Sequence, residues 1–513
     1  MSLVGKVGRR RPRAIFALFV VYLLLAIGAV TTLYPFMLMV SGGFKGPTDQ
    51  DDNSVIPKFW FDKDELYTKY INDKYRQDQS DIAATRTGDA SVNLVGEYRD
   101  FLAALPLDQW KAGFGLAPSQ TTSRLDTEYR DWLRSRFRGD IAAYNRAYLE
   151  EQTSFDLVSV PAELFDQPKW KPRLGQRWSD WLEFKATLPP EFRVPITATG
   201  LYQKWMKGRF QNQFNQVPPE LRGSAKKFEE LSIPNSGEIR SEFLRTKLPP
   251  QFKSATVEEE WANKVGGGKT MPVEAFERQQ LAQKSNEIKG EMSSRNFRYV
   301  LSYMALNGRA LWNTAIFALL TILTQLIVNP LAAYALSRYP IRATNKILLF
   351  LLATMAFPAE VAAIPSFLLL KDLGLLNTFA ALVLPTAASG YMIFLLKGFF
   401  DSLPTELFEA GQLDGAKEIT LMMRIALPLS KPVLGYLALL AFMAAYGTFL
   451  YAFLVAQDQR MWTIMVFIYQ LQTAGAPRAV LMAAFTLAAI PTLLIFLLCQ
   501  NVIMKGIILP GER

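Results

Sequence analysis

Apolar positions gather into six long runs along the chain, and polar segments of unequal length separate them. A helix needs about 20 consecutive apolar residues to cross the roughly 30 Å hydrocarbon layer of a membrane. The runs that reach this length are Ala14–Val40, Leu311–Leu336, Ile347–Leu370, Phe379–Phe400, Val433–Val455 and Val480–Ile503. The pattern therefore predicts an all-α membrane protein with six transmembrane helices. The first run is too long for a signal peptide, and we expect it to be a retained span.

Basic residues cluster in three places that six spans would put on one side of the membrane. Short cytoplasmic loops carry an excess of Lys and Arg. We therefore expect a multi-pass protein of a bacterial inner (plasma) membrane, with both termini in the cytoplasm. The clusters are Arg9, Arg10, Arg11 and Arg13 before the first run, Arg338, Arg342 and Lys346 after the second, and Lys417, Arg424 and Lys431 after the fourth.

The alternation of apolar and polar segments divides the chain into four predicted parts. Residues 1–13 form a basic cytoplasmic N-terminus, and 14–45 form the first transmembrane helix. Residues 46–305 form an extracytoplasmic insertion, and 306–513 form a five-helix core with a cytoplasmic loop at 401–432.

The composition removes several classes of active site. The chain has no histidine and only one cysteine, Cys499. It therefore lacks imidazole bases, Ser-His-Asp triads, His-ligated metals and intrachain disulfides, and we expect no metal site. The net charge of +10 is explained by basic cytoplasmic loops, and no Arg-rich helix or aromatic pattern indicates nucleic acid.

The loop between the fourth and fifth runs contains an ordered set of small, acidic and apolar residues. It reads Glu409-Ala410-Gly411-Gln412-Leu413-Asp414-Gly415-Ala416, followed by Ile425-Ala426-Leu427-Pro428. Pro404 and Thr405 predict a helix start, with Glu406 and Glu409 near its positive N-terminal end. Gly415 predicts the end of that helix, and Leu427-Pro428 predicts the start of the next element.

The same loop resembles the cytoplasmic coupling motif of the permease subunits of ATP-binding-cassette (ABC) importers. Every interval of that motif is present, and Gly411 replaces the usual alanine. The resemblance implies a permease that is not itself an enzyme and binds no cofactor, because ATP and Mg are held by a partner ATPase. It implies a coupling role for Glu409, Ala410, Gly411, Asp414, Gly415, Ala416, Leu427 and Pro428. The alternative for this loop is an ordinary amphipathic interfacial helix with no partner.

Further segments resemble the second permease subunit of maltose-type carbohydrate importers. They are Tyr34-Pro35 with Ser41, Phe44 and Lys45, then Ala332 to Arg338, and finally Met504-Lys505-Gly506. The resemblance implies a second homologous permease, two ATPase copies, an extracytoplasmic solute-binding protein and import of a sugar or oligosaccharide by alternating access. The chain departs from that family at Tyr446-Gly447-Thr448-Phe449 and at its last residues, 509–513, which leaves the solute open.

Polar residues inside the apolar runs are candidates for the substrate path. An ionisable group among lipids is costly, so Glu360, between Pro358 and Pro365, is expected to face an aqueous cavity or the outer interface. The other candidates could equally form interhelical hydrogen bonds, and they are Gln325, Asn329, Ser389, Tyr391 and Tyr446.

The insertion contains four related pieces that predict short helices. They are Tyr98–Leu102, Tyr129–Leu133, Ser179–Leu182 and Ser241–Leu244, and three of them precede a Leu-Pro pair. We therefore expect a mainly helical domain that docks a binding protein or shields the external gate. Trp170, Trp178, Trp181 and Trp205 could form its core or a sugar-stacking face. The run Gly266-Gly267-Gly268-Lys269-Thr270 lacks the upstream glycine of a phosphate loop and is interpreted as a linker.

Three alternatives stay open from the sequence. One is an ABC permease for a non-sugar solute, and another is a secondary transporter, which leaves the coupling loop unexplained. The third is a membrane-anchored glycan-binding or glycosidase-like domain, because Trp132 to Asn145 is similar to a helical stretch of some β-galactosidase-like glycosidases. A glycosidase needs two facing carboxylates, usually at strand ends, and no strand–helix alternation is present to build such a barrel.

Overall fold

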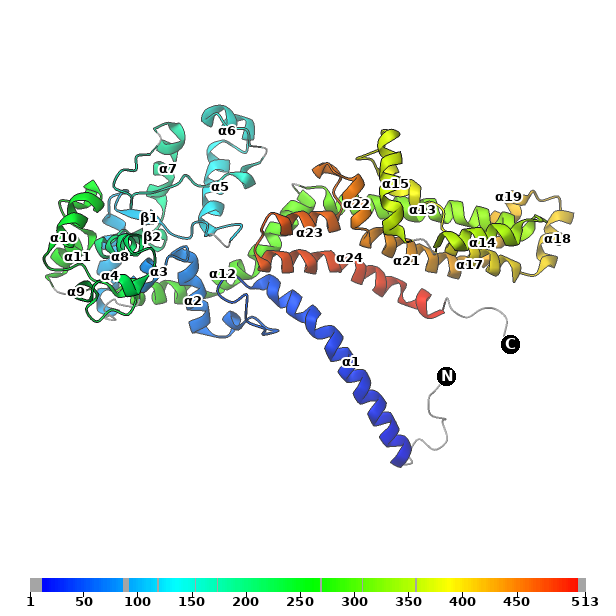
Figure 1. The fold of residues 1–513 in the computed structure, drawn as a ribbon, viewed down its shortest axis with the longest axis horizontal. Helices are drawn as coiled ribbons and strands as arrows, with labels where there is room; N and C mark the ends of the chain where they lie inside the picture. The colour runs from blue at the N-terminus through cyan, green and yellow to red at the C-terminus, as the bar shows by residue number, and fades with distance from the viewer. Residues whose placement is uncertain are drawn as a thin grey trace. The chain divides into compact units, whose positions relative to one another are not determined.

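The computed structural model describes residues 12–85, 92–117, 120–152, 154–172, 174–267, 270–306, 308–355 and 358–505. These residues fall into two compact units, one up to residue 295 and one from residue 296. Both units are built almost entirely of helices (Figure 1), which confirms the predicted all-α class. The predicted arginines 9–11, Gly506 and residues 509–513 lie outside the described residues.

The first unit begins with one long apolar helix, α1 (Pro12–Phe44), which contains the first predicted span. Most of its side chains are exposed in the isolated chain; Leu24, for example, is 63% exposed. A helix that is apolar on all faces and covered by no protein is typical of a membrane span. Beyond α1, this unit contains α2 (Lys63–Lys74), α3 (Gln79–Ala84), α4 (Val95–Ala104), α5 (Arg124–Arg136), α6 (Ile141–Tyr148), α7 (Gln176–Thr187), α8 (Ala198–Arg209), α9 (Pro219–Arg222), α10 (Glu238–Glu242), α11 (Val257–Val265) and the part of α12 (Val273–Leu301) up to residue 295.

Side chains at the helix starts explain why the polar insertion folds into short helices. Asp62 accepts hydrogen bonds from two backbone N–H groups at the start of α2, and Ser123 accepts one at the start of α5. Thr256 and Glu259 form a reciprocal capping box at the start of α11. Each such cap satisfies N–H groups that have no partner within the helix and stabilises it by about 1 kcal/mol.

The related pieces of the insertion all lie in helices, as predicted. Pieces one to three lie in α4, α5 and α7, and the fourth spans α10 and the π-helical turn η7 (Phe243–Lys247). Three of these helices end one or two residues before a proline, which cannot continue a helix and restricts the residue before it.

Aromatic side chains fill the core of the first unit. Trp110, Trp181 and Trp261 are at most 1% exposed, and Trp170, Trp178 and Trp205 are partly buried at or near that core. Trp181 therefore belongs to the core. The one sheet among the described residues pairs β1 (Trp110–Ala112) with β2 (Arg193–Pro195) in antiparallel register, with Lys111 opposite Val194.

The first glycines of the run that starts at residue 266 end helix α11. Gly266 has a φ of +80° and ends α11, donating its N–H to the carbonyl of Ala262. Gly267 donates to the same carbonyl at 2.8 Å. A left-handed residue after the last helical turn is the usual position for glycine. Gly268 and Lys269 lie outside the described residues.

The second unit is a set of apolar helices centred on α13. The helix α13 (Ala310–Arg338) packs against α17 (Gly390–Asp401) and α21 (Lys431–Gly447), and α21 in turn packs against α24 (Arg478–Lys505). The remaining helices are α14 (Thr344–Met355), α15 (Ala359–Asp372), α16 (Phe379–Val383), α18 (Thr405–Leu413), α19 (Glu418–Leu421), α20 (Leu427–Leu429), α22 (Leu450–Val455) and α23 (Ile464–Thr473).

The described helices give a lower count of spans than the apolar runs predict. By length and composition, three helices are able to cross a membrane, namely Leu18–Phe44, Ala310–Arg338 and Arg478–Gln500. The count rises to five if each bent pair is one span: Phe379–Thr386 with Gly390–Asp401, bent by 50°, and Glu418–Leu429 with Lys431–Gly447, bent by 81°. The count of six stays a prediction.

Two predicted spans are not continuous helices. The run Ile347–Leu370 is divided between α14 and α15, and α15 starts directly after Pro358. The run Val433–Val455 is interrupted where Thr448 takes an extended conformation after α21. Uniform hydropathy hides both breaks, because proline and local backbone geometry end a helix without changing the apolar character of the run.

Candidate functional site

The loop at 401–432 folds into two short helical arms joined by a tight turn. The first arm, α18, follows Pro404, and Thr405 is its first residue and provides no side-chain cap. Gly415 has a φ of +78°. The Gly415 N–H donates to the Gln412 carbonyl at 2.9 Å, and the Ala416 N–H donates to the Gly411 carbonyl at 3.0 Å. This pair of bonds is a Schellman motif, so the predicted helix end at Gly415 is confirmed.

The second arm runs from Glu418 to Leu429 through α19, the π-helical turn η11 (Met422–Ala426) and α20. It packs closely against the first arm at Gly411. A Cβ atom added to Gly411 would lie 2.5 Å from Cδ2 of Leu421 and 3.6 Å from Cδ1 of Ile425. Glycine therefore lets the two arms meet at this point without displacing the Leu421 side chain.

Phe408 anchors the first arm to the end of α13. Its side chain is 5% exposed and lies in a cluster with Tyr334 and Phe400. The Arg338 guanidinium carbon lies 3.7 Å from the centre of the Phe408 ring, an arrangement typical of a cation–π contact. The Tyr334 hydroxyl donates to Oε2 of Glu418 at 3.1 Å. Both arms are thereby attached to the same turn of α13.

The end of α17 joins the same contact network. Arg338 donates to the Phe400 carbonyl at 2.8 Å, and the Ser337 hydroxyl donates to Oδ1 of Asp401 at 2.7 Å. Lys397, near the end of α17, pairs with Asp401 one helical turn away. The C-terminal ends of α13 and α17 and the two-arm element are therefore held together by hydrogen bonds, an ion pair and ring contacts.

All the residues predicted for ATPase coupling lie in this two-arm element, mostly on its surface. Glu409, Ala410, Asp414, Gly415 and Pro428 are exposed, and Gly411, Ala416 and Leu427 are half-buried. Large apolar side chains lie beside them, and Leu413 is 89% exposed. The element thus has a buried side that faces α13 and α17 and an exposed apolar side that is suited to contact another protein.

Sequence reasoning missed the residues on the buried side. Phe408, Tyr334, Arg338 and Glu418 come from two segments that lie about 70 to 80 positions apart in the sequence. The sequence of α18 did not single out Phe408, because its apolar neighbours Leu407 and Leu413 are exposed.

Three of the predicted path residues meet at the break between α16 and α17. Gln325 donates to the Thr386 carbonyl at 2.7 Å, and Oδ1 of Asn329 accepts the Ser389 backbone N–H at 2.8 Å. A broken helix exposes backbone groups that lipid cannot satisfy, so neighbouring side chains must do so. The buried Oε1 of Gln325 has no hydrogen-bond partner among the described residues.

The other path candidates are dispersed. The Tyr446 hydroxyl donates to the Ala488 carbonyl at 2.5 Å and ties α21 to α24. Tyr391 is 36% exposed on α17. Glu360 lies in α15, and its side chain is outside the described part of the chain. The assignment of these residues to a substrate path stays a prediction.

The sequence matches a known family of membrane components. Residues 329–508 match the model of the binding-protein-dependent transport system inner membrane component, and this range includes the whole two-arm element. The sn-glycerol-3-phosphate transport system permease protein UgpE of Rhizobium meliloti (strain 1021) is 33% identical over 205 residues, which cover 39% of this chain and 72% of that protein. The chain belongs to this family. It is therefore the permease subunit of an ABC importer, as the coupling motif predicts.

Other known transport proteins are similar over a comparable share of the chain. The polygalacturonan/rhamnogalacturonan transport system permease protein YtcP of Bacillus subtilis (strain 168) is 30% identical over 205 residues, 37% of this chain and 71% of that protein. A solved bacterial ABC transporter involved in the import of the acidic polysaccharide alginate is 24% identical, with a TM-score of 0.37, over 40% of this chain and 78% of the other. The family model starts at residue 329, so it does not cover the insertion.

Proposed function

We propose that this permease carries a sugar or oligosaccharide across the bacterial inner membrane by alternating access. Relatives of about 30% identity support a polyhydroxylated solute, since one is named for polygalacturonan and rhamnogalacturonan transport. A second candidate is a polyol phosphate, because several equally similar relatives are named for sn-glycerol-3-phosphate transport. The solute specificity of the cognate binding protein separates the two.

The observation that carries the proposal is that the two-arm element, from here on the α18–α20 element, has one side buried against α13 and α17 and one exposed side. Its partner on the exposed side is an ABC ATPase, present in two copies, and Glu409, Ala410, Asp414 and Gly415 lie on that side. Movement of the docked element pulls on α13 and α17 through Phe408, Tyr334 and Arg338. A second homologous permease and an extracytoplasmic solute-binding protein complete the assembly. ATP and Mg are bound by the ATPase and not by this chain.

The orientation follows from the same assignment. An ATPase in the cytoplasm requires the α18–α20 element, and with six spans both termini, to be cytoplasmic. The insertion is then extracytoplasmic, on the side where a binding protein delivers solute. Within the membrane, Oε1 of Gln325, which has no hydrogen-bond partner in the described part of the chain, is the strongest candidate for contact with a passing hydroxyl. Further positions along the path are Asn329, Glu360, Ser389, Tyr391 and Tyr446.

Affinity purification of the full chain in mild detergent tests the proposal. The wild-type chain is expected to recover an ABC ATPase and a second permease. Leu413→Asp places an unpaired charge in the docking surface and should reduce ATPase recovery at least about tenfold, which corresponds to 1.4 kcal/mol. The matched control is Thr405→Asp, which adds the same charge at the first turn of α18, where it favours the helix dipole. Equal recovery with both variants, or no ATPase with the wild type, would contradict the proposal.

A further inference from the structure

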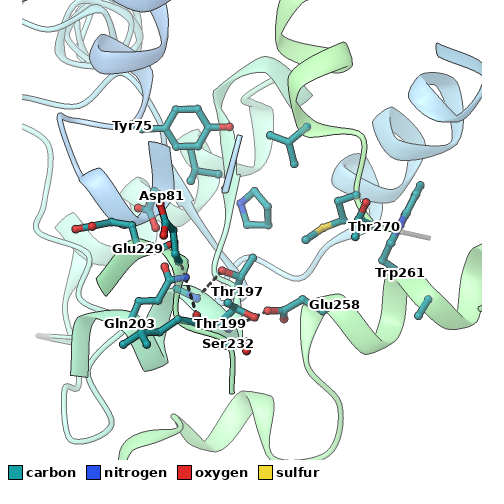
Figure 2. A pocket seen from close by; sticks show the side chains of 18 residues that line it. Tyr75, Asp81, Thr197, Thr199, Gln203, Glu229, Ser232, Glu258, Trp261 and Thr270 are labelled. Atoms are coloured by element: carbon teal, nitrogen blue, oxygen red, sulfur yellow. Dashed lines mark hydrogen bonds between the residues drawn. The ribbon is translucent and has the colours of Figure 1, made fainter. Parts of the chain in front are cut away.

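The first unit contains a cavity of about 440 Å³ at the start of α8. Its walls come from β2, α8, the loop after η6 (Phe228–Glu230), α11 and the segment that leads into α12. Figure 2 shows Gln203, Thr197 and Thr199 on one side of the cavity and the Tyr75 ring on the other. The volume is within the range of about 300 to 1,000 Å³ that small-molecule sites occupy.

Gln203 provides a fixed hydrogen-bond acceptor in this cavity. The residue is 6% exposed, and its Nε2 donates to the carbonyls of Glu229 and Leu231, both at 3.0 Å. These two bonds use both donors and hold the amide in one orientation. No hydrogen bond to its Oε1 occurs within the described residues, and the residue lines the cavity. This oxygen is therefore available to accept a hydrogen bond from a ligand hydroxyl or a water in the cavity.

Two of the carboxylates that line the cavity are paired with lysines. Asp81 pairs with Lys111 and, at 3.3 Å, with Lys204. Glu229 lies 3.6 Å from Lys207. Each of these carboxylates can still accept a hydrogen bond from a ligand hydroxyl, since an ionised carboxylate has about four acceptor positions. A cationic ligand gains little from carboxylates that are paired with lysines.

Glu258 is compensated in a different way. Its two oxygens accept the backbone N–H groups of Ala198 and Thr199, at 3.1 and 3.0 Å, at the positive end of α8. No lysine or arginine is among the described residues that line the cavity. A phosphate or a sugar acid would therefore enter without a countercharge. Because burying an unpaired charge is costly, anionic ligands are excluded.

The remaining walls are apolar or carry hydroxyls. The Tyr75 hydroxyl already donates to Glu277 at 2.9 Å, so the ring and not the hydroxyl is available to the cavity. Trp261, Val194 and Met271 add apolar surface, and Thr199 and Ser232 add hydroxyls. Carboxylate and amide acceptors that neighbouring groups hold in place, together with hydroxyls and apolar walls, match the C–H faces and hydroxyl edges of a neutral sugar.

We propose that this cavity binds a neutral sugar unit, either a free mono- or disaccharide or the end of an oligosaccharide. Gln203 Oε1, Glu229 and Glu258 accept hydrogen bonds from its hydroxyls, and the Tyr75 ring covers its apolar face. This site is separate from the membrane path and does not depend on the transported solute. Its failure would leave the proposed transport function intact, because that function is tested by ATPase recovery with Leu413→Asp.

Saturation-transfer-difference NMR on the full-length chain in lipid nanodiscs tests the site. The probes are the neutral disaccharides maltose, sucrose, lactose and xylobiose, with digalacturonate as the anionic comparison. At least one neutral disaccharide is expected to give a saturable signal. Digalacturonate is expected not to compete with that disaccharide for binding. Absence of a signal from all four neutral sugars, or competition by digalacturonate, would overturn the proposal.

Two substitutions on one loop locate the binding. Ser232 is exposed and lines the cavity, whereas Ser236 is exposed on the same loop and does not line it. Ser232→Trp should obstruct the entrance and weaken binding at least about tenfold, or 1.4 kcal/mol, while Ser236→Trp leaves it unchanged. A second pair, Thr199→Phe inside the cavity and Thr246→Phe on an exposed helical turn, should behave in the same way. Equal binding by both members of each pair would show that the sugar binds elsewhere and refute the proposal.

Discussion

The two units of the molecule bury polar side chains of different kinds. Among the described residues, the first unit buries ten charged side chains, whereas the second buries only neutral amides and hydroxyls. In the first unit, Lys74 and Glu277 lie 2.5 Å apart and are almost fully buried. In the second, Asn329 satisfies the Ser389 N–H at a helix break.

We attribute the difference to the solvent around these side chains, which is water for the polar insertion and lipid for the apolar helices. A chain that folds in water can enclose a charge together with its partner, and the pair then fixes the arrangement of helices. A helix in lipid has no water to solvate a charge before it is paired, and its most costly unsatisfied groups are those of its own backbone. Neutral amides meet that requirement without introducing a net charge.

The largest expected effect comes from breaking the buried pair of the first unit. Glu277→Gln removes the counter-ion of Lys74 and weakens the acceptor of the Tyr70 and Tyr75 hydroxyls, which donate to it at 3.2 and 2.9 Å. Isolating a buried charge costs about 3 to 5 kcal/mol. Urea unfolding of the full chain, followed by tryptophan fluorescence, measures the loss. The control Glu274→Gln breaks the exposed pair with Arg278 and should change stability by less than about 0.5 kcal/mol. Similar losses in both variants would contradict a special stabilising role for the buried charges of the first unit.

A smaller effect is expected from the neutral network of the second unit. Asn329→Leu keeps the approximate shape of the side chain but leaves the Ser389 N–H without its acceptor and removes the side-chain donor to the Gln325 carbonyl. An unsatisfied buried group costs about 1 to 3 kcal/mol. Thermal unfolding in detergent, read by size-exclusion chromatography, measures it. The control is Thr321→Val on the same helix, because the buried Thr321 hydroxyl has no partner among the described residues and its removal should be neutral or stabilising. If Thr321→Val destabilised as much as Asn329→Leu, the network would not be the cause.

The smallest effect concerns pH. Burial raises the pKa of Asp73, but the Arg295 guanidinium, which donates to both oxygens of this carboxylate, lowers the pKa by more. The pKa of Asp73 therefore lies below its usual value of 3.8. A carboxyl with a lowered folded pKa stabilises the protein above its unfolded pKa and loses that contribution as the pH falls through the folded pKa. The stability difference between wild type and Asp73→Asn should therefore shrink as the pH is lowered from 6 toward 3. A constant difference in urea midpoint over this range would contradict the assignment.

Local signals were predicted well from the sequence. Gly415 ends α18 because only a left-handed residue closes its Schellman turn, and the Leu-Pro pairs of the insertion end short helices. Such features depend on one residue and its near neighbours. The all-α class and the membrane character followed in the same way from long apolar runs.

Breaks and tertiary contacts were not accessible in this way. Hydropathy represents Ile347–Leu370 as one run, although α14 ends before Pro358 and α15 begins after it. The anchoring of Phe408 by Tyr334 and Arg338 depends on how α13 meets α18, which no periodicity encodes. The path candidates Gln325 and Asn329 were selected by residue type, and the structure adds that they support a helix break.

The central claim is that the α18–α20 element transmits ATPase movement to α13 and α17 through Phe408. The most direct test is the ratio of solute transported to ATP hydrolysed by the co-purified complex in proteoliposomes. Phe408→Ala removes the anchor but not the exposed docking side, and Phe394→Ala, on a side chain of α17 that is 47% exposed, is the matched control. The account predicts that Phe408→Ala retains the ATPase and its hydrolysis while transport per ATP falls at least about tenfold, because a buried Phe→Ala change costs about 3 to 5 kcal/mol of packing. An unchanged ratio in a folded Phe408→Ala complex would contradict it.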